Sequence, residues 1–497
     1  MAVAAQTVES ARVLAPIIIT FLAPFAVWLL RKNQDLREGV SFAAAAMAFA
    51  AVVSMVPGVL DGVVWTYHVV TFFPGVSITF AVDGLSCIFA IVATFLWFFA
   101  TSYNIGYMRT LKEHAQTRYY FCFAVAIFGA VGVAFSGTIV TLYLFYEVIT
   151  VFTYPLVAHH QDVEGYHGAR KYLVYLMGTS KLFLLPAMIL TYVQCGTLDF
   201  NLSNIGQGMF PPGADPTLVT ITYFLFIFGL AKAAIMPLHN WLPSAMVAPT
   251  PVSALLHAVA VVKAGVFSVS RIMLSCFGVD LLSHLGLGLI TAYLAAFTIV
   301  VASIIALTKT DLKARLAYST VSQLSYIIIG VAMLSPLAIK GGLLHIAHHA
   351  FAKITLFFAA GAIYVATHLR EIPLMDGLGR KLPFTFGAFA VAALSMVGVP
   401  PVCGFVSKWY LVNGAVSIHQ YILLIALLAS TLLNAGYFVP VVYRAFFRPP
   451  VAGMDHSQYR EAPMVMVVPL CLTALISVLL GLYPQFFLSF INVFGKF

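Results

Sequence analysis

Long apolar runs cover most of the chain, and they constrain its fold more than any other feature of the sequence. About 20 consecutive apolar residues is the length that an α-helix needs to cross the hydrocarbon core of a bilayer. Of the 497 residues, 62% are hydrophobic and only 9% are charged, whereas soluble domains carry about 25% charged residues. This composition excludes an ordinary soluble enzyme and predicts an all-α protein that spans a membrane many times.

The apolar runs are separated by charged or by Gly-, Pro-, Asn- and Asp-rich stretches, and they predict fourteen transmembrane helices. The predicted spans are 11–30, 40–60, 80–104, 119–136, 138–158, 172–195, 217–239, 250–274, 282–308, 314–335, 338–367, 383–414, 420–443 and 463–493. Met1 to Ser10 predicts a retained tail, since no charged region with a cleavage site precedes the first run.

Lys and Arg are concentrated in alternate loops. Loops with odd numbers hold 17 of them, whereas loops with even numbers hold Lys340 and, at a helix end, Arg271. Cytoplasmic loops are enriched in these residues, so the pattern predicts a multi-pass protein of the cell (inner) membrane with both termini on the non-cytoplasmic side. The net charge of +9 is then a topology signal, and we expect no nucleic-acid partner.

Motifs for cofactors are missing from the sequence. The six cysteines stand singly, without a CxxC pair or the spacing of metal ligands. No Gly-rich phosphate loop of the Walker or dinucleotide-binding kind occurs. We therefore expect no cofactor, no metal and no redox centre in this chain.

A few charged residues fall within the predicted helices. They are Lys181, Lys232, Lys263, Lys353, Lys408 and Glu147, with Asp83 at a helix entrance. Each charge at the bilayer centre costs about 2.5–3.5 kcal/mol, so six isolated charges would cost on the order of 15 kcal/mol. One such lysine is explained by snorkelling to an interface or by a structural ion pair; the whole set indicates an ion pathway.

Glu147 lies near the middle of the fifth span. Burial favours its neutral form and a nearby lysine favours its charged form, so a moving partner would make it gain or lose a proton. In the seventh span, Pro237 cannot donate to the carbonyl of Ala233, beside Lys232. Unpaired backbone at membrane depth is tolerated inside protein or against water, which predicts that Lys232 lines a hydrated cavity.

The eighth and eleventh spans add histidines. His257 and Lys263 are six residues apart, which separates them by about 9 Å along a helix and makes them candidates for successive steps of a pathway. His345, His349 and Lys353 follow one another at steps of four and predict a polar stripe on an apolar helix. Histidines at this spacing also suit a metal, but no cluster of Cys, Asp or Glu accompanies them.

The twelfth span contains a second broken helix with a buried lysine. Gly398, Pro400, Pro401 and Gly404 precede Lys408, as a proline break accompanies Lys232 in the seventh span. Broken helices at corresponding positions of two halves indicate inverted repeats with sites near the midplane.

At these motifs the sequence resembles the antiporter-like family, which comprises the large proton-pumping membrane subunits of respiratory complex I, hydrogenase-linked relatives and Mrp-type cation/proton antiporter subunits. The resemblance rests on Lys232-Ala-Ala-Ile-Met-Pro-Leu-His-Asn-Trp-Leu-Pro, Ala248-Pro-Thr-Pro-Val-Ser-Ala-Leu-Leu-His257 through Lys263-Ala-Gly-Val-Phe, Thr308 to Gln323, His348-His-Ala-Phe-Ala-Lys353 and Gly398-Val-Pro-Pro-Val-Cys-Gly-Phe-Val-Ser-Lys408.

The resemblance implies fourteen helices, with helices 4–8 and 9–13 as inverted repeats. The corresponding units here are residues 1–118 for helices 1–3, 119–275 for the first repeat, 282–447 for the second and 448–497 for helix 14. By motif position, Glu147 resembles the family's glutamate and Lys232 its paired lysine. The relay of helix 8 corresponds to His257 and Lys263, the connecting lysine of helix 11 to Lys353, and the exit residue to Lys408.

Two departures leave the subfamily open. The exit residue is a lysine, whereas one class of complex I subunit has glutamate, and the chain ends after helix 14 whereas the largest class continues into a lateral helix. Lys181 matches no motif of the family. Complex I-like, hydrogenase-linked and antiporter subunits all remain possible.

The leading hypothesis is a proton-translocating subunit of a redox-driven or cation/proton antiport complex, which implies other membrane subunits as partners and protons, with or without Na⁺, as cargo. The alternative is a stand-alone secondary transporter of an organic or inorganic ion. A purely structural anchor is disfavoured, because an anchor has no need of five buried lysines.

Overall fold

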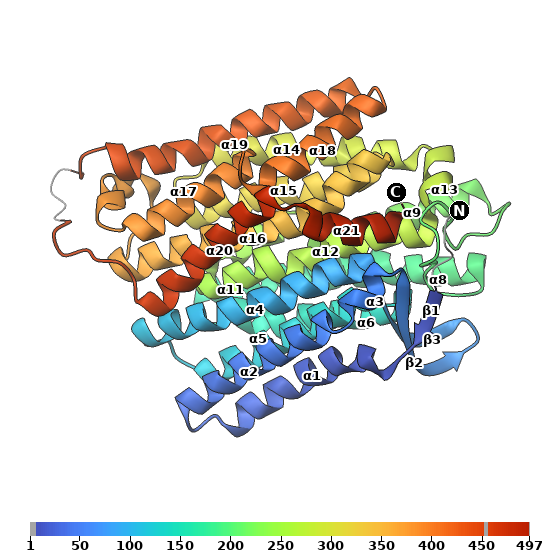
Figure 1. Cartoon of the computed structure of the whole chain (residues 1–497), viewed down its shortest axis with the longest axis horizontal. Coiled ribbons are helices and arrows are strands. Elements are labelled where there is room, and N and C mark those ends of the chain that lie inside the picture. Colours follow the sequence, from blue (N-terminus) through green and yellow to red (C-terminus); the bar gives the residue numbers. More distant parts are fainter. Residues whose placement is uncertain (1–5, 452–455, 497) are drawn as a thin grey trace.

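The computed structural model describes residues 6–451 and 456–496, without the side chains of residues 256 and 257. It is a bundle of helices that run mostly along one common direction (Figure 1). The first half of the helices comprises α1 (Leu14–Leu29), α2 (Gln34–Val53), α3 (Val56–Leu60), α4 (Gly84–Thr110), α5 (Gln116–Ala134), α6 (Ile139–Val157), α7 (Val163–Thr179), α8 (Leu185–Cys195), α9 (Pro216–Gly229), α10 (Trp241–Ser244), α11 (Thr250–Ala254) and α12 (Val261–Arg271). The second half comprises α13 (Val279–His284), α14 (Leu287–Thr308), α15 (Leu312–Ala332), α16 (Pro336–Thr367), α17 (Pro383–Val397), α18 (Cys403–Ser417), α19 (Tyr421–Phe447), α20 (Met464–Leu482) and α21 (Gln485–Gly495).

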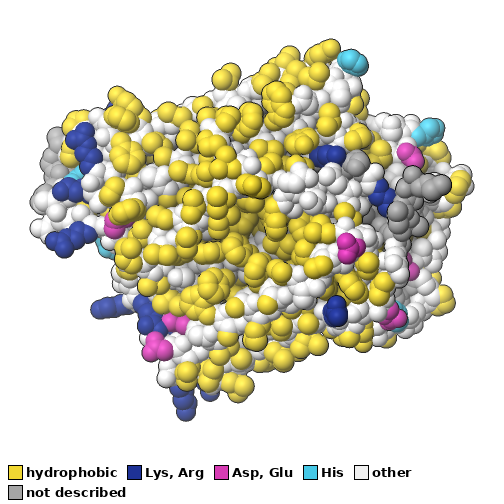
Figure 2. Space-filling view, viewed as in Figure 1, with side chains coloured by type: hydrophobic (Ala, Val, Ile, Leu, Met, Phe, Trp, Pro, Cys, Tyr) yellow, Lys and Arg dark blue, Asp and Glu magenta, His cyan; other side chains and the backbone are white. Residues whose placement is uncertain are grey.

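Within the described residues, 10 helices are long and apolar enough to cross a membrane. Each of the fourteen predicted runs overlaps a helix, although several are interrupted or shorter than expected. Figure 2 shows apolar side chains over most of the visible face and Lys and Arg gathered mainly at the end away from the sheet. An apolar belt between polar ends is what a bilayer requires of a helical bundle.

The expectation of an all-α fold is wrong at one end of the bundle, where a three-stranded sheet lies. Strand β1 (Gln6–Glu9) pairs in parallel with β2 (Val63–Phe73), which pairs antiparallel with β3 (Val76–Val82). The segment is rich in Val, Thr and Phe, which suit a strand, and Pro74-Gly75 forms its turn, with Gly75 at φ +76°. Both ends of the chain lie at this end (Figure 1).

Both predicted helix breaks are present. Helix α9 ends at Gly229, eight residues before Pro237, and the chain continues through the 3₁₀ turn η3 (Ala231–Ala233) before α10 begins at Trp241. The second break separates α17 from α18, with Gly398 at φ +91° directly after α17. The first break is wider than a proline kink, because Pro237 removes one amide whereas Leu230 and Ala234 also leave the helical conformation.

Three segments of the described chain are π turns, of which η6 (Ile272–Phe277) directly follows α12. Segment η2 (Ser180–Leu184) joins α7 to α8 and contains Lys181, and segment η5 (Leu255–Val259) joins α11 to α12 and contains His257. Insertions of this kind widen a helix locally and occur frequently at functional sites.

Candidate functional site

The predicted charged residues come from several segments of the bundle. Glu147 lies on α6, Lys232 in η3 and Lys263 on α12, while α16 contributes His345, His349 and Lys353 and α18 contributes Lys408. All these lysines and both of these histidines are buried. His257 lies in η5, and its side chain is outside the described part of the chain.

Glu147 has a different partner from the one that the family resemblance implies. Its Oε2 lies 3.7 Å from Nζ of Lys181, which also donates a hydrogen bond of 2.5 Å to the Tyr143 hydroxyl. The Lys181 side chain is 47% exposed and the Glu147 side chain 14%, so this pair lies at the edge of the bundle. Lys181, to which the sequence assigned no role, therefore belongs to the site.

Lys232 contacts the same helix as Glu147, but through polar atoms of α6. Its ammonium donates to the carbonyl oxygen of Tyr146 at 2.8 Å and to the hydroxyl of Thr150 at 2.7 Å. It also lies 3.1 Å from the centroid of the Tyr146 ring, a cation–π contact. The Tyr146 hydroxyl in turn accepts a hydrogen bond from the Lys232 backbone at 3.1 Å.

The helix break at Lys232 is held by close packing against α12. A Cβ atom on Gly265 would lie 2.4 Å from the carbonyl carbon of Lys232 and 2.4 Å from the nitrogen of Ala233. Since both atoms belong to the backbone, a larger residue would displace the break. On the other side, the Trp241 indole donates to the carbonyl of Ala231 at 3.0 Å.

Lys263 and His349 form a direct buried contact between α12 and α16, with Nζ and Nδ1 separated by 2.7 Å. One turn away on α16, the His345 ring stacks at 5.8 Å from the His349 ring, measured between centroids. The predicted polar stripe on α16 is therefore present, and one of its residues, His349, contacts α12.

His345 is held on both ring nitrogens. Its Nε2 lies 3.0 Å from Oε1 of Gln323 and its Nδ1 lies 2.8 Å from Oγ of Ser407. Because an amide oxygen only accepts, Nε2 carries the proton and Nδ1 accepts from the serine. Ser407 directly precedes Lys408, so His345 links the histidine stripe to the last predicted residue.

The two remaining lysines have oxygen partners. Lys408 donates to the free carbonyls at the end of α17, 2.6 Å to Met396 and 3.1 Å to Val397. A cation at a helix carboxyl end is favoured by the helix dipole. Lys353 donates to the Ser319 hydroxyl on α15 at 2.9 Å, and thus extends the polar stripe of α16 toward a further helix.

Sequence reasoning missed several residues that partner the lysines and histidines. They are Thr150, Ser319, Gln323 and Ser407, whereas Lys181 was named from the sequence without a role. The usable signal was polarity inside apolar helices: Ser319 and Gln323 both lie within the stretch from Thr308 to Gln323 that carries the family resemblance. Thr150 and Ser407 stand near Glu147 and Lys408 in sequence, but one residue alone does not reveal which helix it faces.

A buried ion pair that includes none of these lysines holds α12 in place. The Arg271 guanidinium at the end of α12 donates to both oxygens of Asp83, at 2.5 and 2.8 Å. Asp83 is also the N-cap of α4, accepting from the Ser86 amide at 2.9 Å. The pair fixes α12, and with it Lys263, against α4.

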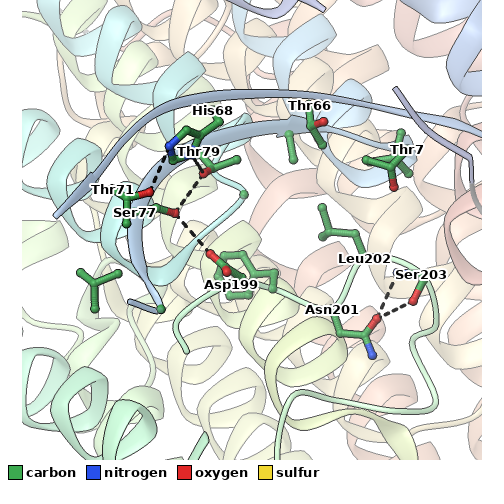
Figure 3. A pocket seen from close by; sticks show the side chains of 16 residues that line it. Thr7, Thr66, His68, Thr71, Ser77, Thr79, Asp199, Asn201, Leu202 and Ser203 are labelled. Atoms are coloured by element: carbon green, nitrogen blue, oxygen red, sulfur yellow. Dashed lines mark hydrogen bonds between the residues drawn. The ribbon is translucent and has the colours of Figure 1, made fainter. Parts of the chain in front are cut away.

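A separate cavity of about 510 Å³ lies between the sheet and residues 199–203 (Figure 3). Its polar side chains bond to one another: His68 lies 3.2 Å from Thr79 and 3.1 Å from Thr71, and Ser77 donates to Asp199 at 3.4 Å. None of its lining residues is one of the predicted site residues. We therefore place the candidate site along the buried lysines and not in this cavity.

Two family profiles match the chain. The profile described as "NADH:quinone oxidoreductase/Mrp antiporter, TM" matches residues 136–434, which include all the predicted site residues. The profile described as "NADH-Ubiquinone oxidoreductase (complex I), chain 5 N-terminus" matches residues 73–120.

Similar proteins come from both branches of this group. The N subunit of the NADH-quinone oxidoreductase of Desulforudis audaxviator is 32% identical over 492 residues, which cover 96% of each chain. A probable K⁺/H⁺ antiporter protein of Rhizobium meliloti is 31% identical over 96% of this chain, which spans about half (48%) of that relative.

The fold matches a chain in the structure of the Mrp complex from Dietzia sp. DQ12-45-1b, with a TM-score of 0.87 and 22% identity over 98% of this chain and 97% of that one. The motif, the sequence relatives and the fold agree, and the chain belongs to the family of antiporter-like membrane subunits found in NADH:quinone oxidoreductases and Mrp antiporters.

Proposed function

We propose that this chain is a proton-translocating subunit of a multisubunit complex, driven by a redox reaction or coupled to cation antiport. The single observation that carries the proposal is the buried contact of Lys263 with His349 at 2.7 Å, continued by His345 to Ser407 and Lys408. Ionisable side chains are costly to bury inside a membrane, and those that are kept there typically mark an ion or proton pathway. Neither an anchor nor a structural ion pair accounts for them.

The proposed pathway begins at the break in the seventh predicted helix. In this proposal protons reach Lys232 at the break, pass by way of His257 and Lys263 to His349 and His345, and leave at Lys408, with Lys353 as a connecting site. At both breaks the backbone leaves the helical hydrogen-bond pattern, and such backbone occurs at membrane depth only inside protein or against water. The two breaks lie in the two proposed repeats, 119–275 and 282–447, of a fourteen-helix unit.

Glu147 controls the first step in this proposal. In the structure its carboxylate faces Lys181 while Lys232 bonds to Tyr146 and Thr150. Movement of the carboxylate from Lys181 toward Lys232 would raise the proton affinity of Lys232 and lower that of Lys181. In this proposal the Glu147 carboxylate has two positions, one beside Lys181 and one beside Lys232. Lys181 is a positioning residue, because it holds the carboxylate in the first of them.

The concentration of Lys and Arg in alternate loops supports a cytoplasmic position for the end of the bundle opposite the sheet. On this basis we propose a plasma-membrane protein whose termini are non-cytoplasmic. The relatives imply other membrane subunits as partners and H⁺, with or without Na⁺ or K⁺, as cargo.

The test is proton pumping by the whole complex in liposomes, measured with a pH-sensitive dye. We expect Glu147→Gln and Lys232→Met to reduce pumping to background and Lys181→Met to reduce it strongly. The control Lys32→Met removes an exposed loop lysine and should pump like the wild type. Undiminished pumping by both Glu147→Gln and Lys232→Met in assembled complexes would refute the pathway.

Copurification separates the proposed function from a stand-alone transporter. In mild detergent we expect further membrane subunits to remain bound; flavin and iron–sulfur subunits would identify a redox-driven complex and small membrane proteins alone an antiporter. Ion transport by the purified chain without partners would favour the stand-alone transporter.

A further inference from the structure

Two loops at the end of the bundle opposite the sheet meet in space. Residues 111–115 connect α4 to α5, and residues 158–162 connect α6 to α7. Each loop turns sharply through residues with positive φ, Lys112 and Ala115 in the first and Gln161 in the second. The Arg118 guanidinium joins them by donating to the carbonyl of His159 at 2.9 Å.

Three potential metal ligands converge where these loops meet. One ligand atom each of Glu113, His114 and His159 lies within 4.8 Å of the others. The Nε2 atom of His159 faces Oε2 of Glu113 at 3.6 Å, and Nδ1 of His160 lies 3.8 Å from the same oxygen. Three histidines thus surround one carboxylate.

His159 gives an independent indication of a ligand. Its side chain is completely buried, yet its Nδ1 has no hydrogen-bond partner among the described residues and its Nε2 lies beside the Glu113 carboxylate at 3.6 Å, beyond hydrogen-bond distance. Buried polar atoms in native structures nearly always have a partner, and an orphan indicates a bound water or ion. The Tyr119 ring packs nearly perpendicular to the imidazole, at 81° and 5.7 Å between centroids, and restricts its rotation.

The ligand set fits a borderline divalent cation. Zn²⁺ binds His nitrogen and carboxylate oxygen at about 2.0–2.2 Å in a tetrahedron, which places neighbouring ligand atoms about 3.4 Å apart. The 3.6 Å between His159 and Glu113 and the 3.8 Å between His160 and Glu113 are already close to this spacing. His114 is exposed and can turn inward without disturbing the core.

We propose that Glu113, His114 and His159 bind a divalent transition-metal ion such as Zn²⁺, and that water or the neighbouring His160, whose Nδ1 lies 3.8 Å from the Glu113 carboxylate, completes the coordination. The ion joins the α4–α5 loop to the α6–α7 loop. The site lies beyond Val157, the last residue of α6, which is ten residues or about 15 Å along the helix from Glu147, so occupancy restrains the helix that bears the proposed gating carboxylate. The site does not depend on the proposed proton pathway.

Metal binding is measured on the full-length chain in its complex, purified without a polyhistidine tag and stripped with a chelator. Zn²⁺ is titrated by calorimetry, and Co²⁺ is used as an optical probe because its visible absorption strengthens in four-coordinate sites. The variants are Glu113→Gln, His159→Gln and His114→Ala. The control, His284→Ala, removes an exposed histidine on α13, at the end with the sheet.

We expect one high-affinity Zn²⁺ per chain, an intense Co²⁺ spectrum and an affinity at least about tenfold lower in His114→Ala, which alters no buried group. Glu113→Gln and His159→Gln should abolish high-affinity binding, and the control should match the wild type. Equal affinity in the wild type and His114→Ala, or a weak six-coordinate Co²⁺ spectrum, would overturn the proposal and leave the cluster as a Glu113–His159 ion pair.

Discussion

The Asp83–Arg271 pair gives a quantitative test of how the bundle holds Lys263 in place. Both side chains are buried, 5% and 1% exposed, and two short hydrogen bonds join them. Two unit charges about 4 Å apart at an effective dielectric constant of 20 attract by about 4 kcal/mol. Removing one partner of such a pair leaves a buried charge uncompensated and typically costs about 3–5 kcal/mol.

Asp83→Asn isolates this effect. Asparagine caps a helix about as well as aspartate, so the capping bond to Ser86 is kept while the negative charge is lost. We expect the free energy of unfolding to fall by about 3–5 kcal/mol. Arg271→Met should cost less, because the remaining carboxyl can take up a proton, and the double variant should cost less than the two single effects added together.

The assay is unfolding by SDS in mixed micelles, followed by far-UV circular dichroism, for the wild type, both single variants and the double variant. The double-mutant cycle should give a coupling free energy of at least about 2 kcal/mol. A coupling below about 0.5 kcal/mol, which is the range of independent sites, would refute the inference that the pair binds α12 to α4.

Two other substitutions probe the surroundings of the lysines. Gly265→Ala places a Cβ 2.4 Å from backbone atoms of Lys232 and Ala233, so we expect lower thermal stability of the complex and loss of pumping. The control is Gly178→Ala on α7, where nothing lies within 4 Å, and it should leave pumping unchanged. Equal loss of pumping in the two variants would contradict the steric argument. Ser319→Ala removes the hydroxyl that Lys353 contacts and should lower the free energy of unfolding by about 1.5–3 kcal/mol in the same SDS assay. The control is Ser54→Ala, which removes an exposed hydroxyl. An equal decrease in the free energy of unfolding for the two variants would show that the hydrogen bond to Lys353 contributes nothing.

Much of the helical architecture could be predicted, because in lipid each spanning segment must satisfy its own backbone hydrogen bonds and therefore shows a long apolar run. The sheet at Val63–Val82 could not be found in this way. Most of it lies outside the predicted runs, although residues 80–82 of β3 were assigned to the predicted span 80–104, and its strand β2 pairs with β1 more than fifty residues earlier in the chain.

The candidate site was predicted in its residue types and not in its contacts. Charges in apolar runs are conspicuous, so the sequence by itself determined that Lys232, Lys263, Lys353 and Lys408 lie inside the bundle. The partner of each charge depends on which helices are neighbours. The contact of Glu147 with Lys181 joins residues 34 positions apart, and a family motif that lacks Lys181 could not indicate it.

In the loops, too, the residue types are visible in the sequence whereas their contacts are not. The sequence predicted no metal site in this chain, and Glu113 and His114 are separated from His159 in sequence by the whole of α5 and α6, so their spacing gave no sign of one. The return of α6 alongside α5 brings the two loops together, because antiparallel neighbouring helices place alternate loops at the same end of a bundle. The sequence by itself determined that the chain lives in a membrane and which charges it buries; the tertiary structure decided which of those charges, and which loop side chains, face one another.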